Sequence, residues 1–172
     1  MTFADERVVD LLNTKFVLAW DNHGTVRGGD GARQPVFTKE ELALYPEGAG
    51  GANVRTFICK PDGSVVHAVE GWYSADRYLE ELHFGVELLD AKELVERHAE
   101  HARHHRDAQK KIEREEPGEM AKEFVNSAAR RRHAALGLQA SMHELAKAWL
   151  GKEIAAVIKQ VRLEAEASGE ID

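Results

Sequence analysis

A single cysteine, Cys59, is present in the chain of 172 residues. One thiol cannot form an internal disulfide, a CxxC redox pair or a zinc site built from several thiolates. Cys59 follows Phe57 and Ile58 in a β-rich run, a setting typical of a small buried side chain rather than of a reactive thiol. A dithiol mechanism needs a second cysteine to resolve the mixed disulfide, so this chain cannot perform one alone.

Long apolar runs are also missing, because no segment approaches the roughly 20 residues that a membrane-spanning helix needs. The first residues contain no basic region followed by an apolar one, which a secretory signal would show. The net charge of −7 argues against nonspecific binding to nucleic acid or to an anionic membrane. We therefore expect a cytoplasmic protein whose partner is another protein or a second copy of itself, with no nucleic-acid or membrane partner.

The chain has the composition of a globular protein, with 43% hydrophobic and 31% charged residues. Its two halves differ in charge and in pattern. Residues 1–90 carry 8 basic and 15 acidic side chains, whereas residues 91–172 carry 15 of each. The first half alternates short apolar runs with glycine-rich loops, as α/β domains do, and the second half has helical periodicity only.

Several elements of the first half are predicted from local signals. Asp5 is placed to cap a short helix, and the apolar run "KFVLAW" at 15–20 lacks polar alternation, as a strand covered on both faces does. Thr38 and Glu41 form a capping box for a second short helix, at 39–45. These signals predict alternating helices and strands.

A β-hairpin is the most legible prediction of the first half. The β-rich runs 54–59 and 64–69 are joined by "KPDG", in which proline presets the first central turn position and Gly63 accepts a positive φ. Ser74 follows as the N-cap of a helix that continues to about residue 89.

The second half predicts helices only. Residues 90–116 have the pattern of one long helix, which "EPGE" at 116–119 interrupts. A second helix follows, and a capping box at Ser141 and Glu144 indicates the start of a last helix. That last helix has an apolar stripe: Met142, Leu145, Trp149, Ile154, Ile158 and Val161. We expect these helices to form a hairpin or three-helix extension, packed on the first half or on a second subunit.

Two segments of the first half resemble the thioredoxin superfamily. "FADERVVDLLNTKFVLAW" is similar to the family's segment after the active site, and "VRTFICKPDGSVVHAVEGWYSADRYLEEL" is similar to its second half. The resemblance implies an α/β fold: a partial thioredoxin-like sandwich at residues 1–89, followed by a C-terminal α-helical extension at residues 90–172.

The chain departs from that family at the positions that carry the family's chemistry. Its CxxC motif and the strand before it would precede Phe3, and Arg55 stands where the family has a cis-proline. The resemblance therefore implies a non-catalytic interaction or scaffold protein that uses its helical extension for self-association or partner binding. The alternative is a thiol-disulfide oxidoreductase whose CxxC segment lies upstream of this chain.

A histidine cluster in the long predicted helix is the sharpest chemical signal. "ERHAEHARHH" contains His98, His101, His104 and His105. His101 and His105 lie four residues apart on one helix face and His98 lies one turn earlier, so these three are the predicted ligands of a transition metal.

Such a site is incomplete on one helix, and His133 or His143 could close it if the helices fold back. No HExxH pattern accompanies the cluster. The plainer interpretation, which composition favours, is a solvated polar helix face with no cofactor.

Overall fold

The computed structural model describes residues 4–19, 55–71, 73–121 and 127–168. This part of the chain is mostly helical, with one two-stranded antiparallel sheet. In chain order its elements are α1 (Glu6–Lys15), β1 (Arg55–Cys59), β2 (Val65–Glu70), α3 (Ala75–Leu88), α4 (Leu94–Glu115), α5 (Pro117–Met120), α6 (Ala128–Ala146) and α7 (Ile154–Ser168).

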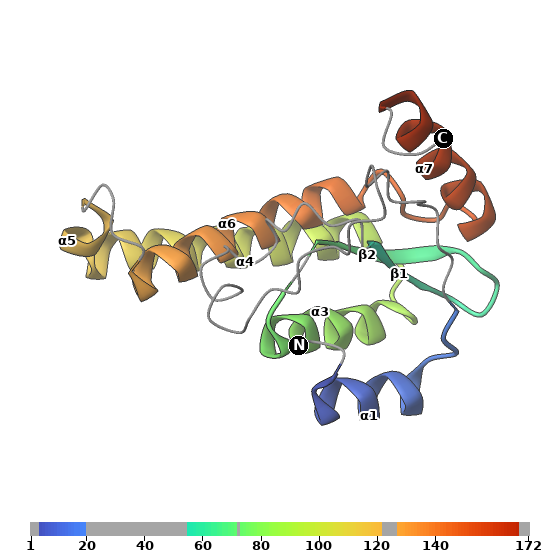
Figure 1. Ribbon diagram of the computed structural model, residues 1–172, viewed down its shortest axis with the longest axis horizontal. Coiled ribbons are helices and arrows are strands. Elements are labelled where there is room, and N and C mark those ends of the chain that lie inside the picture. The colour runs from blue at the N-terminus through green and yellow to red at the C-terminus, as the bar shows by residue number, and fades with distance from the viewer. Residues whose placement is uncertain (1–3, 20–54, 72, 122–126, 169–172) are drawn as a thin grey trace, which may run out of the picture.

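The sheet lies between two groups of helices. In Figure 1, α1 and α3 lie on one side of β1 and β2, and α6 and α7 lie on the other. Strand β2 is buried from Val65 to Val69. Val66 and Val69 pack with α1 and α3 in one apolar cluster, while Val65 and Ala68 pack in a second cluster that includes Val157 of α7.

Helices α4 and α6 run side by side as an antiparallel hairpin, connected through the short helix α5 (Figure 1). The expected single helix at 90–116 is confirmed as α4, and it ends just before Pro117 as predicted. Helix α6 also contacts β2. The extension therefore packs on the first half of its own chain, which was one of the two expected placements.

The predicted β-hairpin is confirmed. Gly63 has φ of 83°, the left-handed conformation that its turn position requires. The Asp62 carboxylate accepts hydrogen bonds from the Ser64 backbone N–H at 2.9 Å and from its hydroxyl at 2.6 Å. The capping predictions also hold, since Asp5 accepts from the backbone of Arg7 and Ser74 caps α3.

The strand predicted at 15–20 is wrong over its described part. Lys15 still belongs to α1, and residues 16–19 form no strand. Val17 is fully exposed and Leu18 is 57% exposed, so this apolar run is not covered by a layer of described residues. An apolar run indicates burial only when a partner surface exists. The helix predicted at 39–45, with its capping box at Thr38 and Glu41, lies outside the described residues.

The predicted helix start at Ser141 is also wrong, because α6 continues from Ala128 to Ala146 without a break. The Ser141 hydroxyl donates to the carbonyl of Gly137 at 3.0 Å, a bond that a serine inside a helix can make. Glu144 pairs instead with Arg106 of α4, at 2.7 Å. The apolar stripe is therefore divided between α6 and α7.

None of the described helices is both long enough and apolar enough to cross a membrane. The helices and the small sheet agree with the expected α/β class in so far as the fold mixes helices and strands. The thioredoxin-like sandwich stays a prediction, as does the division into residues 1–89 and 90–172.

Candidate metal centre

A buried carboxylate lies at the centre of the structure. Glu81 is on the face of α3 that also presents Tyr78, Leu82 and Leu88 to the core, and its side chain is fully buried. A carboxylate is rarely buried unless it is paired or binds a metal ion. The groups that face Glu81 therefore determine what this position does.

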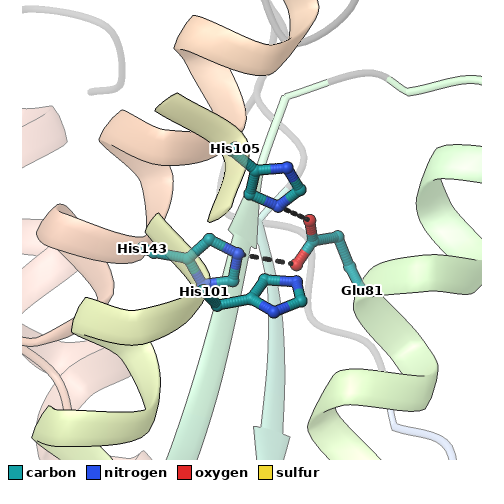
Figure 2. A group of neighbouring side chains, drawn as sticks. All are labelled: Glu81, His101, His105 and His143. Carbon is teal, nitrogen blue, oxygen red and sulfur yellow. Dashed lines mark ion pairs between the residues drawn. The ribbon is translucent and has the colours of Figure 1, made fainter. Parts of the chain in front are cut away.

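Three histidine rings converge on Glu81 (Figure 2). His101 and His105 project from consecutive turns of α4, and His143 comes from α6. One potential ligand atom from each of the four side chains lies within 4.8 Å of all the others. Helices α3, α4 and α6 thus each contribute to one compact group.

The spacing of these atoms suits a single ion. His143 Nε2 lies 3.3 Å from Glu81 Oε2, and His105 Nε2 lies 3.9 Å from Glu81 Oε1. Two ligand atoms of a tetrahedral ion are about 3.3 Å apart when each metal–ligand bond is about 2.0 Å. The first distance matches that edge, and the second needs only a small contraction.

Several nitrogen atoms of the group are buried without a hydrogen-bond partner among the described residues. They are His101 Nε2, His105 Nδ1, His105 Nε2 and His143 Nε2. A buried polar atom without a partner costs about 1–3 kcal/mol, so these unpaired nitrogens around one carboxylate call for an explanation.

A second layer of polar side chains holds the carboxylate in place. His67 of β2 contacts Glu81 Oε2 through Nε2 at 3.1 Å, and Gln139 of α6 donates to Glu81 Oε1 at 2.8 Å. His98 of α4 lies behind His143, with 3.1 Å between their Nδ1 atoms, and its Nε2 lies 3.0 Å from the carbonyl oxygen of Val66.

Phe84 of α3 forms an apolar wall beside these rings. Its ring stacks on His101 with centroids 4.2 Å apart and meets His143 edge-on at 5.0 Å. His67 also meets Phe84 edge-on, at 5.4 Å. An apolar wall lowers the local dielectric and strengthens the electrostatic interactions inside the site.

This environment controls the ionisation of the cluster. Burial lowers the pKa of His98 to about 3 and that of His105 to about 4, and it also lowers the pKa values of His67 and His101. Burial opposes ionisation of Glu81, but the neighbouring nitrogens of His143 and His67 outweigh it and hold the pKa of Glu81 well below its usual value. At neutral pH the carboxylate is therefore ionised, and the imidazoles of His67, His98, His101 and His105 are neutral.

The predicted ligands divide into two groups. His101 and His105 point to the same centre, whereas His98 lies in the layer behind it. His143 closes the group from α6, while His133 instead pairs with Glu113 at 2.7 Å. The interpretation as a solvated helix face is wrong for His98 and His105, which are 0% and 1% exposed.

Sequence reasoning missed Glu81, His67 and Gln139. Two of them had a visible signal: Glu81 interrupts the apolar face of a predicted helix, and His67 lies inside an apolar strand. Gln139 had no such signal. Cys59 lies in the other apolar cluster, half-buried, and burial raises its pKa, which agrees with a structural role.

Comparisons of this chain with protein-family models, with curated proteins and with solved structures found no match. The chemistry of the centre is therefore argued from its own side chains. Those side chains show a buried His/Glu group that could hold a metal ion.

Proposed function

We propose that this protein binds one divalent transition-metal ion through Glu81, His101, His105 and His143. One observation carries the proposal: buried, unpartnered imidazole nitrogens from two helices converge on a buried carboxylate. The ion would connect α3 with the α4–α6 hairpin. Its binding free energy would then add to the stability of the folded chain.

The charge of the site supports a cation. The Glu81 carboxylate is ionised and fully buried, and the histidines whose pKa values burial lowers carry no compensating charge at neutral pH. Hydrogen bonds from the neighbouring histidines favour the ionised form, and a positive charge beside it would stabilise it further. A proton on His143 would supply one positive charge, but it would leave the nitrogens of His101 and His105 unpartnered. A metal ion supplies the charge and uses those nitrogens as well.

The ligand set favours particular metals. Three imidazoles and one carboxylate suit Zn²⁺, Co²⁺, Ni²⁺ or Fe²⁺ better than Mg²⁺ or Ca²⁺, which prefer oxygen ligands. No thiolate contributes, because Cys59 lies in the other apolar cluster. A site with four protein ligands is typical of structural zinc, since catalytic zinc keeps a position open for water or substrate. We therefore propose a structural ion rather than a catalytic one.

Titration with Co²⁺ tests this proposal, because tetrahedral Co²⁺ with nitrogen and oxygen ligands absorbs visible light. The wild-type protein, prepared without an affinity tag, should bind one equivalent with a tetrahedral absorption spectrum. His105→Ala should lose that spectrum. His104→Ala is the matched control, since His104 immediately precedes His105 in α4 but its side chain is exposed.

A Co²⁺ spectrum that is octahedral and equally weak in wild type and His105→Ala would show that the ion binds at the surface. That result would reject the buried centre. The interaction or scaffold role expected from the sequence is independent of this test and stays a prediction.

A further inference from the structure

A chain of hydrogen bonds leads from the sheet to the proposed ion. It begins at the Val66 carbonyl of β2, which lies 3.0 Å from His98 Nε2. A carbonyl oxygen only accepts hydrogen bonds, so His98 Nε2 must carry the hydrogen. His98 is fully buried, and it forms no ion pair with a carboxylate of the described residues. A buried imidazolium without a counter-charge is costly, so His98 is neutral. Its other nitrogen, Nδ1, therefore holds a lone pair.

The next contact follows from this assignment. His98 Nδ1 and His143 Nδ1 lie 3.1 Å apart, and one of the two must donate. Since His98 Nδ1 has a lone pair, His143 Nδ1 carries the hydrogen. With hydrogen on Nδ1, Nε2 is the His143 nitrogen that remains available to a metal ion, and it lies 3.3 Å from the Glu81 carboxylate.

We infer that His98 is a positioning residue, which fixes His143 in the tautomer whose Nε2 binds the metal ion. This inference rests on the proposed function and deepens it. Metal-bound histidines usually donate their second N–H to a neighbouring acceptor, which sets ring orientation and ligand basicity. Here the acceptor would be another imidazole, itself held by a backbone carbonyl.

The same assignment limits the number of ions. His67, His98 and His143 also lie close enough together to suggest a second metal site. In that group, His98 uses both nitrogens in hydrogen bonds, and His67 Nε2 bonds to Glu81 at 3.1 Å. His143 Nδ1 carries a hydrogen. His67 and His98 therefore form the outer layer around His143, which binds the ion through Nε2, and each chain should bind one ion.

Nuclear magnetic resonance of ¹⁵N-histidine-labelled protein tests the tautomer directly. Long-range ¹H–¹⁵N correlation spectra distinguish a ring nitrogen that carries hydrogen from one with a lone pair. In the metal-free wild-type chain, His143 should carry hydrogen on Nδ1. Adding Zn²⁺ should shift the Nε2 resonance and leave Nδ1 protonated. The His143→Gln spectrum would assign the signals.

Substitutions of His98 provide a second measurement. His98→Leu removes the acceptor and should weaken Zn²⁺ binding about 10–100-fold, the usual effect of losing an outer-layer partner. His98→Asn keeps an amide at the position of Nδ1 and should restore part of the affinity. His83→Leu is the control, because His83 is exposed on α3. The spectra of the wild-type chain decide the question if His98→Leu fails to fold.

The outcomes separate the inference from the proposed function. A wild-type chain that binds no Zn²⁺ would overturn both. A Zn²⁺-binding chain whose His143 lacks hydrogen on Nδ1, or unchanged affinity in a folded His98→Leu, would overturn the inference alone. Two tightly bound ions per chain would also reject it. The inference is supported if each chain binds one ion and His143 carries hydrogen on Nδ1. The Zn²⁺ affinity should also fall from wild type to His98→Asn and further to His98→Leu.

Discussion

His143 Nε2 lies 3.3 Å from Glu81 Oε2, and neither side chain is exposed to solvent. The two residues belong to α6 and α3, so this contact joins the helical hairpin to α3. A metal ion bound between these two atoms would therefore stabilise the packing of the hairpin on α3.

Glu81→Gln should abolish metal-dependent stabilisation, and it should also make the metal-free protein less stable than wild type. The substitution keeps the shape of the side chain but removes the carboxylate charge, whose pKa the folded chain holds well below its usual value, so the fold stabilises the ionised form. Thermal unfolding with and without Zn²⁺ measures both effects. A variant whose melting temperature still rose on addition of Zn²⁺ as much as that of wild type would contradict this account.

The metal-free protein should lose stability as the pH falls from about 6.5 toward 3. The folded pKa values of His98 and His105, about 3 and about 4, lie below the unfolded value of 6.5. Between these limits the unfolded chain binds more protons than the folded chain, so acid favours unfolding. Each such histidine contributes at most about 1.4 kcal/mol per pH unit. Glu81 acts in the same direction below pH 4.5, because its folded pKa is also lowered.

Urea unfolding at a series of pH values measures this slope. His98→Leu and His105→Leu should each reduce it, whereas His83→Leu should not, since His83 is exposed. A free energy of unfolding that stayed constant between pH 6.5 and 4 would mean that these rings are not buried in neutral form.

Removing the metal from loaded protein should lower its melting temperature. An ion that binds only the folded chain stabilises it by about 2.7 kcal/mol when its free concentration is 100 times the dissociation constant. Calorimetry before and after dialysis against a chelator measures the difference. His101→Ala should show no such difference, and an equal shift in His101→Ala and wild type would place the ion elsewhere.

Gly85→Ala should destabilise the fold by about 1–3 kcal/mol, the usual effect of overpacking a core. A Cβ atom at Gly85 of α3 would collide with the Ile58 side chain of β1. Gly118→Ala is the control, since no atom lies within 4 Å of the added carbon. Equal melting temperatures for the two variants would show that α3 does not pack tightly on the sheet.

Local signals in the sequence were enough to predict the hairpin, the capped helix α3 and the long helix α4. These elements depend on residues near in sequence, such as Gly63 and Ser74, whose turn and cap roles are set by backbone geometry. The strand expected at 15–20 failed because burial depends on a partner surface, which an apolar run alone does not specify. The cap expected at Ser141 failed because that side chain bonds within the helix instead.

The centre was predictable only in part, because it is assembled across the chain. His101 and His105 share a helix, so their spacing alone indicated a metal site. His143 joins them only because the hairpin folds back, and Glu81 only because α3 faces that hairpin. The assignment of His98 needed its distance to Val66, which the sequence does not contain.

The metal content of the untagged full-length chain, supplied with Zn²⁺ and then dialysed, tests the central claim most directly. We predict one Zn²⁺ per chain in wild type and in His83→Ala, and almost none in the double variant His101→Ala/His105→Ala. Zinc well below one equivalent in wild type, or one equivalent retained by the folded double variant, would contradict a metal centre at Glu81.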